Sequence, residues 1–209
     1  MANTRTRILV NSLVLFNEQG EAQTTTNEIA DETDISPGNL HYHFRKKSDL
    51  IDALLEEFQA DARQVLQAPA GDESAVDEFW GFLQLLVEVM TAYRFLIRDT
   101  ETMVAQYPQV GRAMKGFLTG LMGVLELHIG ALDTRGVIDV SGSDRALLAR
   151  SIAILAIYSQ RLDAALGMET SIEAAASRIA GAAIGQLLPY TTPQSADQLQ
   201  ALLHQYQGQ

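Results

Sequence analysis

The stretch that decides the fold runs from Thr24 to Leu55 and reads TTTNEIADETDISPGNLHYHFRKKSDLIDALL. Thr25 and Glu28 have the T-x-x-E spacing in which a hydroxyl and a carboxylate each satisfy an amide left unpaired at a helix start. This spacing predicts a short helix from about Thr26.

The second half of the stretch predicts a turn and then another helix. We expect the chain to turn at Asp34, with Ile35 filling the corner. Ser36 is a good N-cap, and Pro37 suits a first helical turn because its fixed φ and missing N–H cost nothing there. Local rules leave an alternative open, since Ser-Pro-Gly-Asn is also a turn signal and His-Tyr-His-Phe could form a short strand.

A longer motif overlaps both predicted helices and resembles the signature of the TetR (tetracycline-repressor-like) family of bacterial transcriptional regulators. The motif is I-A-x-x-x-x-[I/V]-S-x-G-x-L-x-x-H-F-x-x-K-x-x-L, formed here by Ile29, Ala30, Ile35, Ser36, Gly38, Leu40, His43, Phe44, Lys47 and Leu50. The resemblance implies an all-α fold. It would have an N-terminal three-helix helix-turn-helix DNA-binding domain and a C-terminal helical domain for ligand binding and dimerisation.

Two positions depart from the family pattern. Asp34 stands where these proteins often have Gly in the turn, and Asp can adopt a left-handed conformation at modest cost. His41 stands where they usually have Tyr, and Tyr42 follows it. The aromatic hydroxyl contact with DNA could therefore come from Tyr42 instead.

A basic run, Arg45-Lys46-Lys47, stands just ahead of a predicted helix with Ser48 as its cap. Cations at a helix start oppose the helix dipole, so the run indicates a site for an external anion such as a DNA phosphate. The alternative is a solvated basic loop.

By resemblance, the residues expected at the DNA lie at the starts of the two motif helices and along the second. Asn39 is the expected base contact, because an amide can bond adenine in a bidentate way. The expected phosphate contact is Lys47. The full set is Thr25, Thr26, Asn27, Pro37, Gly38, Asn39, His41, Tyr42, His43 and Lys47.

Composition limits the other possibilities. The chain has 209 residues, of which 47% are hydrophobic, no cysteine, and a net charge of −11. Residues 1–50 hold five Lys/Arg against seven Asp/Glu, so most of the acid lies in the remainder. We find no apolar run of membrane-spanning length and no secretory signal, and we expect a cytoplasmic protein that does not bind a membrane.

The predicted domains are a helix-turn-helix domain at 1–47, a connecting helix at 48–68, and a helical effector-binding and dimerisation domain at 72–209. The boundary falls at Pro69-Ala70-Gly71-Asp72. Apolar periodicity predicts helices at about 4–19, 48–66, 76–93, 110–132, 143–166, 171–188 and 195–206. The last two long helices are rich in small residues, which suit a close seam between helices. In the resembled family the corresponding helices pair across a two-fold axis, and the alternative is a close intramolecular contact.

Met and aromatic residues of the body could line a pocket for an apolar or amphipathic effector, or could simply be core. These candidates are Trp80, Met90, Tyr93, Met103, Phe117, Met122 and Tyr158. His128 lies on an apolar stripe and is expected to be a satisfied core histidine. Arg94 and Arg98 are expected to form an ordinary salt-bridge cluster with Asp99 and Glu101.

No metal or cofactor is expected. His41 and His43 are two apart on a helix and have no third ligand at a usable spacing. The sequence also lacks nucleophile, phosphate-loop and dinucleotide motifs, which favours a protein that is not an enzyme. The first hypothesis is a homodimeric repressor released from a palindromic double-stranded operator by a small effector. The alternatives are a regulator controlled by a protein partner or by no ligand, and a helical protein or enzyme with an accidental motif.

Overall fold

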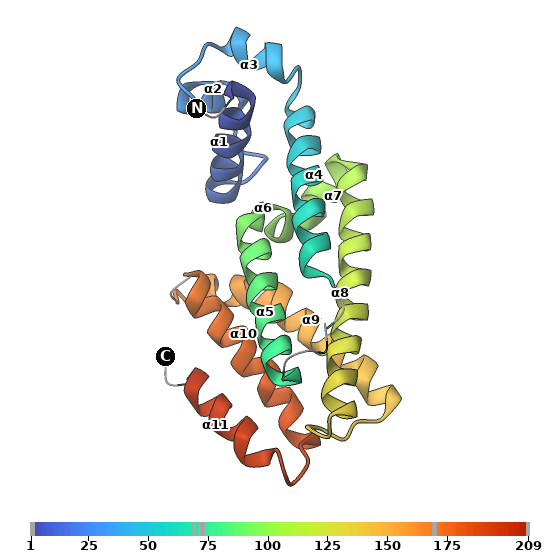
Figure 1. The fold of residues 1–209 in the computed structure, drawn as a ribbon. Helices are drawn as coiled ribbons and strands as arrows, with labels where there is room; N and C mark the ends of the chain where they lie inside the picture. Colours follow the sequence, from blue (N-terminus) through green and yellow to red (C-terminus); the bar gives the residue numbers. More distant parts are fainter. Residues whose placement is uncertain (1–2, 68, 70, 72–73, 169–170, 208–209) are drawn as a thin grey trace. The chain divides into compact units, whose positions relative to one another are not determined.

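The computed structural model describes residues 3–67, 69, 71, 74–168 and 171–207, which fold almost entirely into helices (Figure 1). The all-α prediction is confirmed. Among these described residues the one β-type pairing is an isolated bridge between Ile138 and Thr191. The helices are α1 Thr4–Gln19, α2 Thr26–Glu32, α3 Pro37–His43, α4 Lys47–Val65, α5 Ala75–Ala92, α6 Arg94–Arg98, α7 Thr100–Gln106, α8 Pro108–Thr134, α9 Gly142–Ala165, α10 Ile172–Leu187, the 3-10 helix η1 Leu188–Tyr190 and α11 Ala196–Gln207.

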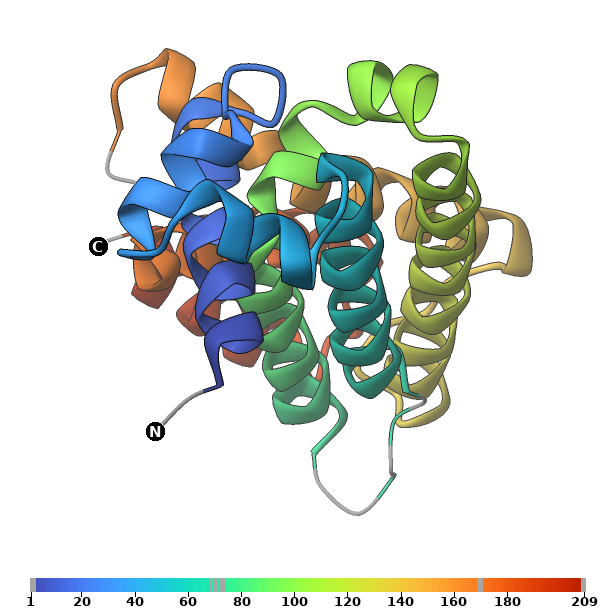
Figure 2. The same cartoon turned by 90° about the horizontal axis from the view of Figure 1, so that it is seen from above.

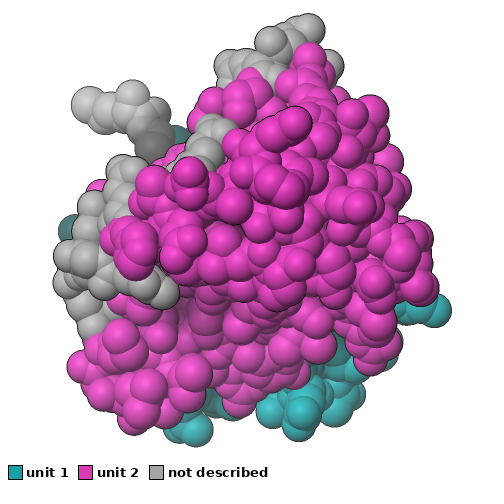
Figure 3. Space-filling model, turned by 90° about the horizontal axis from the view of Figure 1, so that it is seen from below, with its two compact units in different colours: residues 1–62, 92–115 teal, residues 63–91, 116–209 magenta. Residues whose placement is uncertain are grey.

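The chain forms two compact units, coloured separately in Figure 3. Unit 1 contains residues 1–62 and 92–115, and unit 2 contains residues 63–91 and 116–209. The unit that holds the helix-turn-helix therefore also includes α6, α7 and the first turns of α8. The functional domain boundaries at 47/48 and near 70 stay a prediction, and Ala70 and Asp72 of the expected linker lie outside the described residues.

In unit 1, α1 begins and ends at the predicted residues. Asn3 caps it by accepting the Arg5 amide, and Gly20 ends it with a φ of 95°, a conformation that costs glycine least. Its buried face includes Ile8, Ser12 and Phe16. The Ser12 hydroxyl donates to the Ile8 carbonyl at 2.7 Å, so this buried polar group is satisfied.

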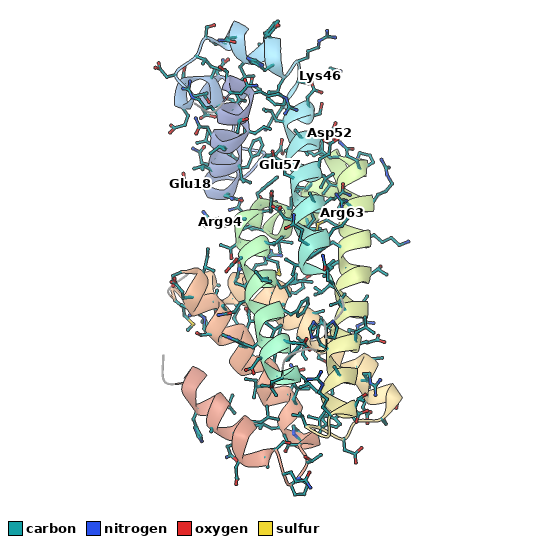
Figure 4. All side chains as sticks on the ribbon, in the orientation of Figure 1. Glu18, Lys46, Asp52, Glu57, Arg63 and Arg94 are labelled. Carbon is teal, nitrogen blue, oxygen red and sulfur yellow. The ribbon has the colours of Figure 1, made fainter. Side chains whose placement is uncertain are left out.

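Sequence periodicity gave no prediction for α6 and α7 as separate helices. The side chains of Arg94, labelled in Figure 4, and Arg98 donate to the Asn17 carbonyl at 3.0 Å each, and Arg98 also donates to the Phe16 carbonyl at 3.2 Å. Of the predicted salt-bridge cluster, the Arg98–Asp99 ion pair of 2.8 Å is present, whereas Arg94 contacts a backbone carbonyl instead. The two cations satisfy the last carbonyls of α1, where the helix dipole also favours positive charge.

In unit 2, α10 packs against α9 and α11. Most of its small residues are buried within the chain, including Ala175, Ala176, Ala180, Gly181 and Ala183. The chain itself covers these five residues, as the intramolecular alternative expects, and pairing of this helix with a second copy stays a prediction. Ala182, in the middle of the same run, is exposed.

Helix α8 is by length and composition long and apolar enough to cross a membrane, contrary to the sequence expectation that no such run exists. Of the residues in its apolar window, 33% are buried within the structure. Core helices pass the same test, and one such helix is weak evidence for a membrane span.

Candidate nucleic-acid interface

The start of α2 is fixed by the predicted capping box. The Thr25 hydroxyl oxygen accepts the Glu28 amide at 3.2 Å, and a Glu28 carboxylate oxygen accepts the Thr25 amide at 2.7 Å. This backbone hydrogen bond is the main reason that the pKa of Glu28 lies below its ordinary value. Thr26 is half-buried, and Asn27 is exposed one residue further along.

The turn after α2 has the left-handed backbone conformation expected of Asp34, which stands where the family often has glycine. Asp34 has a φ of 55° and is the one non-glycine residue with a positive φ in the part of the chain that the structure describes. The Ile35 amide donates to the Ala30 carbonyl at 3.0 Å, which closes the turn. Ile29 and Ala30 are fully buried, while Ile35, expected to fill the corner, is only half-buried.

Helix α1 supports the end of α2 with two side chains. The Arg7 guanidinium donates to the Thr33 carbonyl, and the Asn11 amide donates to the Glu32 carbonyl at 3.1 Å. Arg7 therefore satisfies a helix end rather than projecting from the unit. The Arg5 guanidinium lies 4.9 Å from the centre of the Phe44 ring, a cation–π distance.

Helix α3 presents a polar exposed face over an apolar buried one. Ser36 caps it by accepting the Asn39 amide at 3.2 Å, and Pro37 occupies its first turn, so the helical prediction is confirmed and the strand alternative is wrong. Leu40 and Phe44 are buried on its inner side. Its exposed residues are Pro37, Gly38, Asn39, His41 and Tyr42, the last with 83% of its surface accessible. Figure 2 shows the chain passing from α2 through α3 into α4.

The two histidines of α3 differ in exposure. His41 is exposed, whereas His43 is half-buried with its ring 5.2 Å from that of Tyr42 in an edge-on arrangement. No group of three or more His, Cys, Asp or Glu side chains arranged for a metal ion occurs among the described residues.

The junction of α3 and α4 differs from the prediction at its cap. Helix α4 begins at Lys47, and the Asp49 carboxylate accepts the Lys46 amide at 3.1 Å. The prediction that Ser48 is the N-cap is wrong, because the helix already includes Lys47 and so places Ser48 inside its first turn. Arg45 and Lys46 are exposed here, and Figure 4 labels Lys46 where α4 begins.

Lys47 does not project from the junction. Its ammonium lies 2.8 Å from Glu21 Oε1, also donates to the Glu21 carbonyl, and lies 5.8 Å from the centre of the Phe16 ring. The Glu21 side chain is 1% exposed, and that of Lys47 is 24% exposed. The expected phosphate contact is thus engaged in an intramolecular ion pair in this structure.

The same carboxylate has a second partner that sequence reasoning missed. The Tyr107 hydroxyl donates to Glu21 Oε1 at 2.7 Å. Burial, followed by this hydrogen bond, raises the pKa of Tyr107, so the hydroxyl stays a donor at neutral pH. Glu21 and Tyr107 are 86 residues apart, and no local pattern at either position indicates the contact.

Of the candidate effector residues, only Trp80 lines the apolar cavity found in the described part of unit 2. Trp80 lines a small apolar cavity of about 20 Å³ in unit 2, which is enclosed by α5, α8, α10 and α11. Met90 and Phe117 are buried, Met122 is half-buried, and Tyr158 is 55% exposed on α9. Tyr93 and Met103 belong to unit 1, where the Tyr93 hydroxyl donates to Asp61 at 2.7 Å.

His128 lies in the core of unit 2, as predicted, but it is not satisfied. It is 3% exposed, its ring stacks on that of Phe82 at 4.7 Å, and its Nδ1 has no hydrogen-bond partner within the described part of the chain. Burial lowers the pKa of His128, and the nearby charge of Glu78 opposes that shift.

Comparison with known protein families assigns both parts of the chain. Residues 8–54 match the family described as bacterial regulatory proteins, tetR family, and residues 57–199 match the TetR family described as bacterial transcriptional repressor. These two matched ranges together extend from α1 into α11.

Two bacterial regulators are similar in sequence to part of this chain. The probable HTH-type transcriptional regulator YttP of Bacillus subtilis is 27% identical over 89 residues, which make up 43% of this chain and 43% of that regulator. The HTH-type transcriptional regulator TtgR of Pseudomonas putida is 28% identical over 99 residues, 47% of this chain and 45% of its own length. The matched region thus spans less than half the length of these relatives.

Solved structures resemble the whole chain. A TetR-family transcriptional regulator from Marinobacter aquaeolei has a TM-score of 0.88 at 26% identity, over 98% of this chain and 99% of that one. Salmonella enterica GusR has a TM-score of 0.59 at 25% identity, over 88% of this chain and 95% of its own.

Proposed function

The chain belongs to the TetR family of bacterial DNA-binding transcriptional regulators, and from that premise we propose that it is a homodimeric repressor that reads a palindromic operator with α3. Regulators of this family act by binding rather than by catalysis. The exposed polar face of α3 over buried Leu40 and Phe44 is the observation that carries the proposal. A helix held in this way can enter a major groove without uncovering its own core.

Within α3, Asn39 is the proposed base contact. Its side chain is exposed, so the carboxamide is available to adenine. The hydrogen bond to the Ser36 cap uses only the backbone amide of Asn39. Tyr42 is more exposed than any other large apolar or aromatic side chain recorded in the described residues, and it takes the contact expected from the family tyrosine. Further proposed contacts come from Thr25, Thr26 and Asn27 at the start of α2, and from Pro37, Gly38, His41 and His43.

Dimerisation is proposed through α9. One face of this helix is buried in the chain by Leu148, Ile152 and Ala156. The opposite face carries large apolar side chains that are 50–63% exposed, namely Leu147, Ile154, Tyr158 and Leu162. A helix that is apolar on both faces needs a partner to cover the second face. In a dimer with a two-fold axis, the exposed stripe of one copy can pack against the same stripe of the other copy.

The proposed dimer binds a small apolar or amphipathic effector in unit 2, in the cytoplasm. The cavity beside Trp80 supports this proposal, since it lies within unit 2 and is lined by apolar residues. Its volume of about 20 Å³ holds no more than about one water molecule. A metabolite would therefore have to enlarge it, and this observation favours the second candidate, a regulator controlled by a protein partner or by no small molecule.

The test of operator reading is selection of duplexes from a random pool by the purified protein, followed by sequencing. We expect an enriched inverted repeat whose half-sites are spaced by about one or more helical turns. Enrichment of no shared sequence would contradict the proposal. A saturable change of Trp80 emission by a small molecule that also releases the selected duplex would support effector control, and no change in either signal across a broad screen would favour the second candidate.

A further inference from the structure

The buried carboxylate of Glu21 connects three separate segments of unit 1. Glu21 follows α1, Lys47 begins α4, and Tyr107 ends α7, and both of the last two contact Glu21 Oε1, at 2.8 and 2.7 Å. Glu21 Oε2 is buried and has no hydrogen-bond partner among the residues that the structure describes. Among the described residues, the carboxylate is therefore held by the Lys47 ammonium and the Tyr107 hydroxyl, and no further donor reaches its second oxygen.

The ion pair determines what Lys47 can do. Withdrawing the ammonium would leave Glu21, 1% exposed, as an uncompensated buried charge, which is strongly unfavourable. One phosphate contact at a solvent-exposed surface returns much less, because the attraction is screened by water and salt. Lys47 therefore stays with Glu21, and its positive charge is already neutralised when DNA approaches.

Tyr107 extends this arrangement to the corner between α7 and α8. It is 7% exposed, its amide donates to the Met103 carbonyl at 2.8 Å, and its carbonyl accepts the Val110 amide at 2.9 Å. A second tie lies beside it, where the Gln109 side chain donates to Asp52 at 2.7 Å. The corner thus contacts the first two turns of α4 at two points, one through Glu21 and one directly.

We propose that Glu21 and Tyr107 are positioning residues for operator binding, which hold Lys47 and the start of α4 and so set the presentation of α3 from the α7–α8 corner. This inference rests on the proposed reading of an operator by α3. It also makes operator affinity depend on the corner, because α8 continues along the chain from Pro108 into unit 2.

The test compares Tyr107→Phe with Tyr93→Phe as a matched control. Tyr93 is also a buried tyrosine of unit 1, and its hydroxyl also donates to a carboxylate at 2.7 Å, but that carboxylate is Asp61, on the later part of α4. We expect both variants to lose similar stability. We expect Tyr107→Phe alone to reduce the ratio of affinity for the selected duplex to affinity for a scrambled one, by about fivefold or more, the lower end of ordinary coupling between sites.

Glu21→Gln supplies a readout that a purely structural role would not change. The variant keeps the shape and an acceptor but removes the charge, so Lys47 gains an uncompensated positive charge. We expect tighter binding to the scrambled duplex and a dependence of log affinity on log salt that is steeper by about one unit. As for Tyr107→Phe, we expect a lower ratio of affinity for the selected duplex to affinity for the scrambled one. Adding Lys47→Met to Glu21→Gln should return the slope to that of the wild type.

The outcomes separate the inference from the function on which it rests. If the wild-type protein shows no preference for the selected duplex, the proposed function fails, whatever the variants do. If the wild type discriminates and Tyr107→Phe discriminates equally well, or Glu21→Gln leaves the salt slope unchanged, the positioning role is overturned. If Tyr107→Phe does not fold, the test uses Gln109→Ala, since Gln109 is only half-buried. An affinity ratio in Gln109→Ala equal to that of the wild type would also overturn the inference.

Discussion

The ammonium of Lys47 and the carboxylate of Glu21 form a part-buried ion pair of 2.8 Å, in which the carboxylate is almost completely removed from solvent. A lysine at the start of α4 would by position alone be assigned to a DNA phosphate. In this structure the lysine is engaged by Glu21, and its contact with a DNA phosphate stays a prediction.

Lys47→Met should therefore lower the free energy of unfolding by roughly 3–5 kcal/mol, because it leaves Glu21 buried without its charge partner. Urea unfolding followed by circular dichroism measures the loss. The double variant Lys47→Met, Glu21→Gln removes both charges and should recover most of the stability. A single Lys47→Met variant as stable as the wild type would show that the pair is not formed in solution.

Lys46→Ala should reduce the salt slope of binding by about one unit and weaken all duplexes alike, as expected for a phosphate contact. Lys46 is exposed, and its side chain makes no recorded ion pair with the described residues, so stability should change little. Lys115→Ala, which removes an exposed lysine from α8, is the control and should leave the slope unchanged. An unaltered slope in Lys46→Ala would assign the phosphate contact elsewhere.

The local features of unit 1 could be predicted from the sequence because each depends on residues that are close together along the chain. The Thr25–Glu28 box, the Ser36 cap and the turn at Asp34 each involve residues within a few positions of one another. The Lys47–Glu21 and Tyr107–Glu21 contacts span 26 and 86 residues, and no periodicity encodes them. The sequence therefore indicates a phosphate contact for Lys47 but does not indicate its ion pair with Glu21.

Helices α6 and α7 and the packing of the α10 alanines could not be predicted for a similar reason. Each depends on which surface a segment packs against, whether the end of α1 or the adjoining α9 and α11. Small residues on a helix favour close packing with any partner, within or between chains, and composition does not choose between them.

Stability should fall on acidification because of His128. Burial lowers its pKa below the ordinary value of 6.5, so at pH values under 6.5 the unfolded chain takes up a proton that the folded chain does not. The unfolded state then binds more protons, and stability rises with pH through this range and is lost as the pH falls, by at most about 1.4 kcal/mol per pH unit.

The measurement compares the wild type with His128→Leu at pH 7.5 and pH 5.5, and the expected result is a smaller loss of unfolding free energy between the two pH values in the variant. Glu78 is the charged neighbour recorded at His128, and Glu78→Gln should steepen the loss by removing the charge that favours protonation. Equal losses in the wild type and His128→Leu would refute the assignment.

Leu162→Glu on α9 should dissociate the proposed dimer, because it places a charge within the exposed apolar stripe that must be covered by the second copy. Analytical ultracentrifugation measures the molar mass. Leu127→Glu is a matched control, since Leu127 is a 52% exposed leucine of α8 outside the stripe. A Leu162→Glu protein that remains dimeric would move the interface away from this face of α9.

The most direct test of operator reading by α3 is the ratio of affinities for the selected duplex and a scrambled one, measured for the wild type and Asn39→Ala by fluorescence anisotropy at one salt concentration. The account predicts that the wild type prefers the selected duplex and that Asn39→Ala loses roughly 1–3 kcal/mol of that preference while its binding to the scrambled duplex stays the same. Equal binding of both duplexes by the wild type, or an undiminished preference in Asn39→Ala, would contradict it.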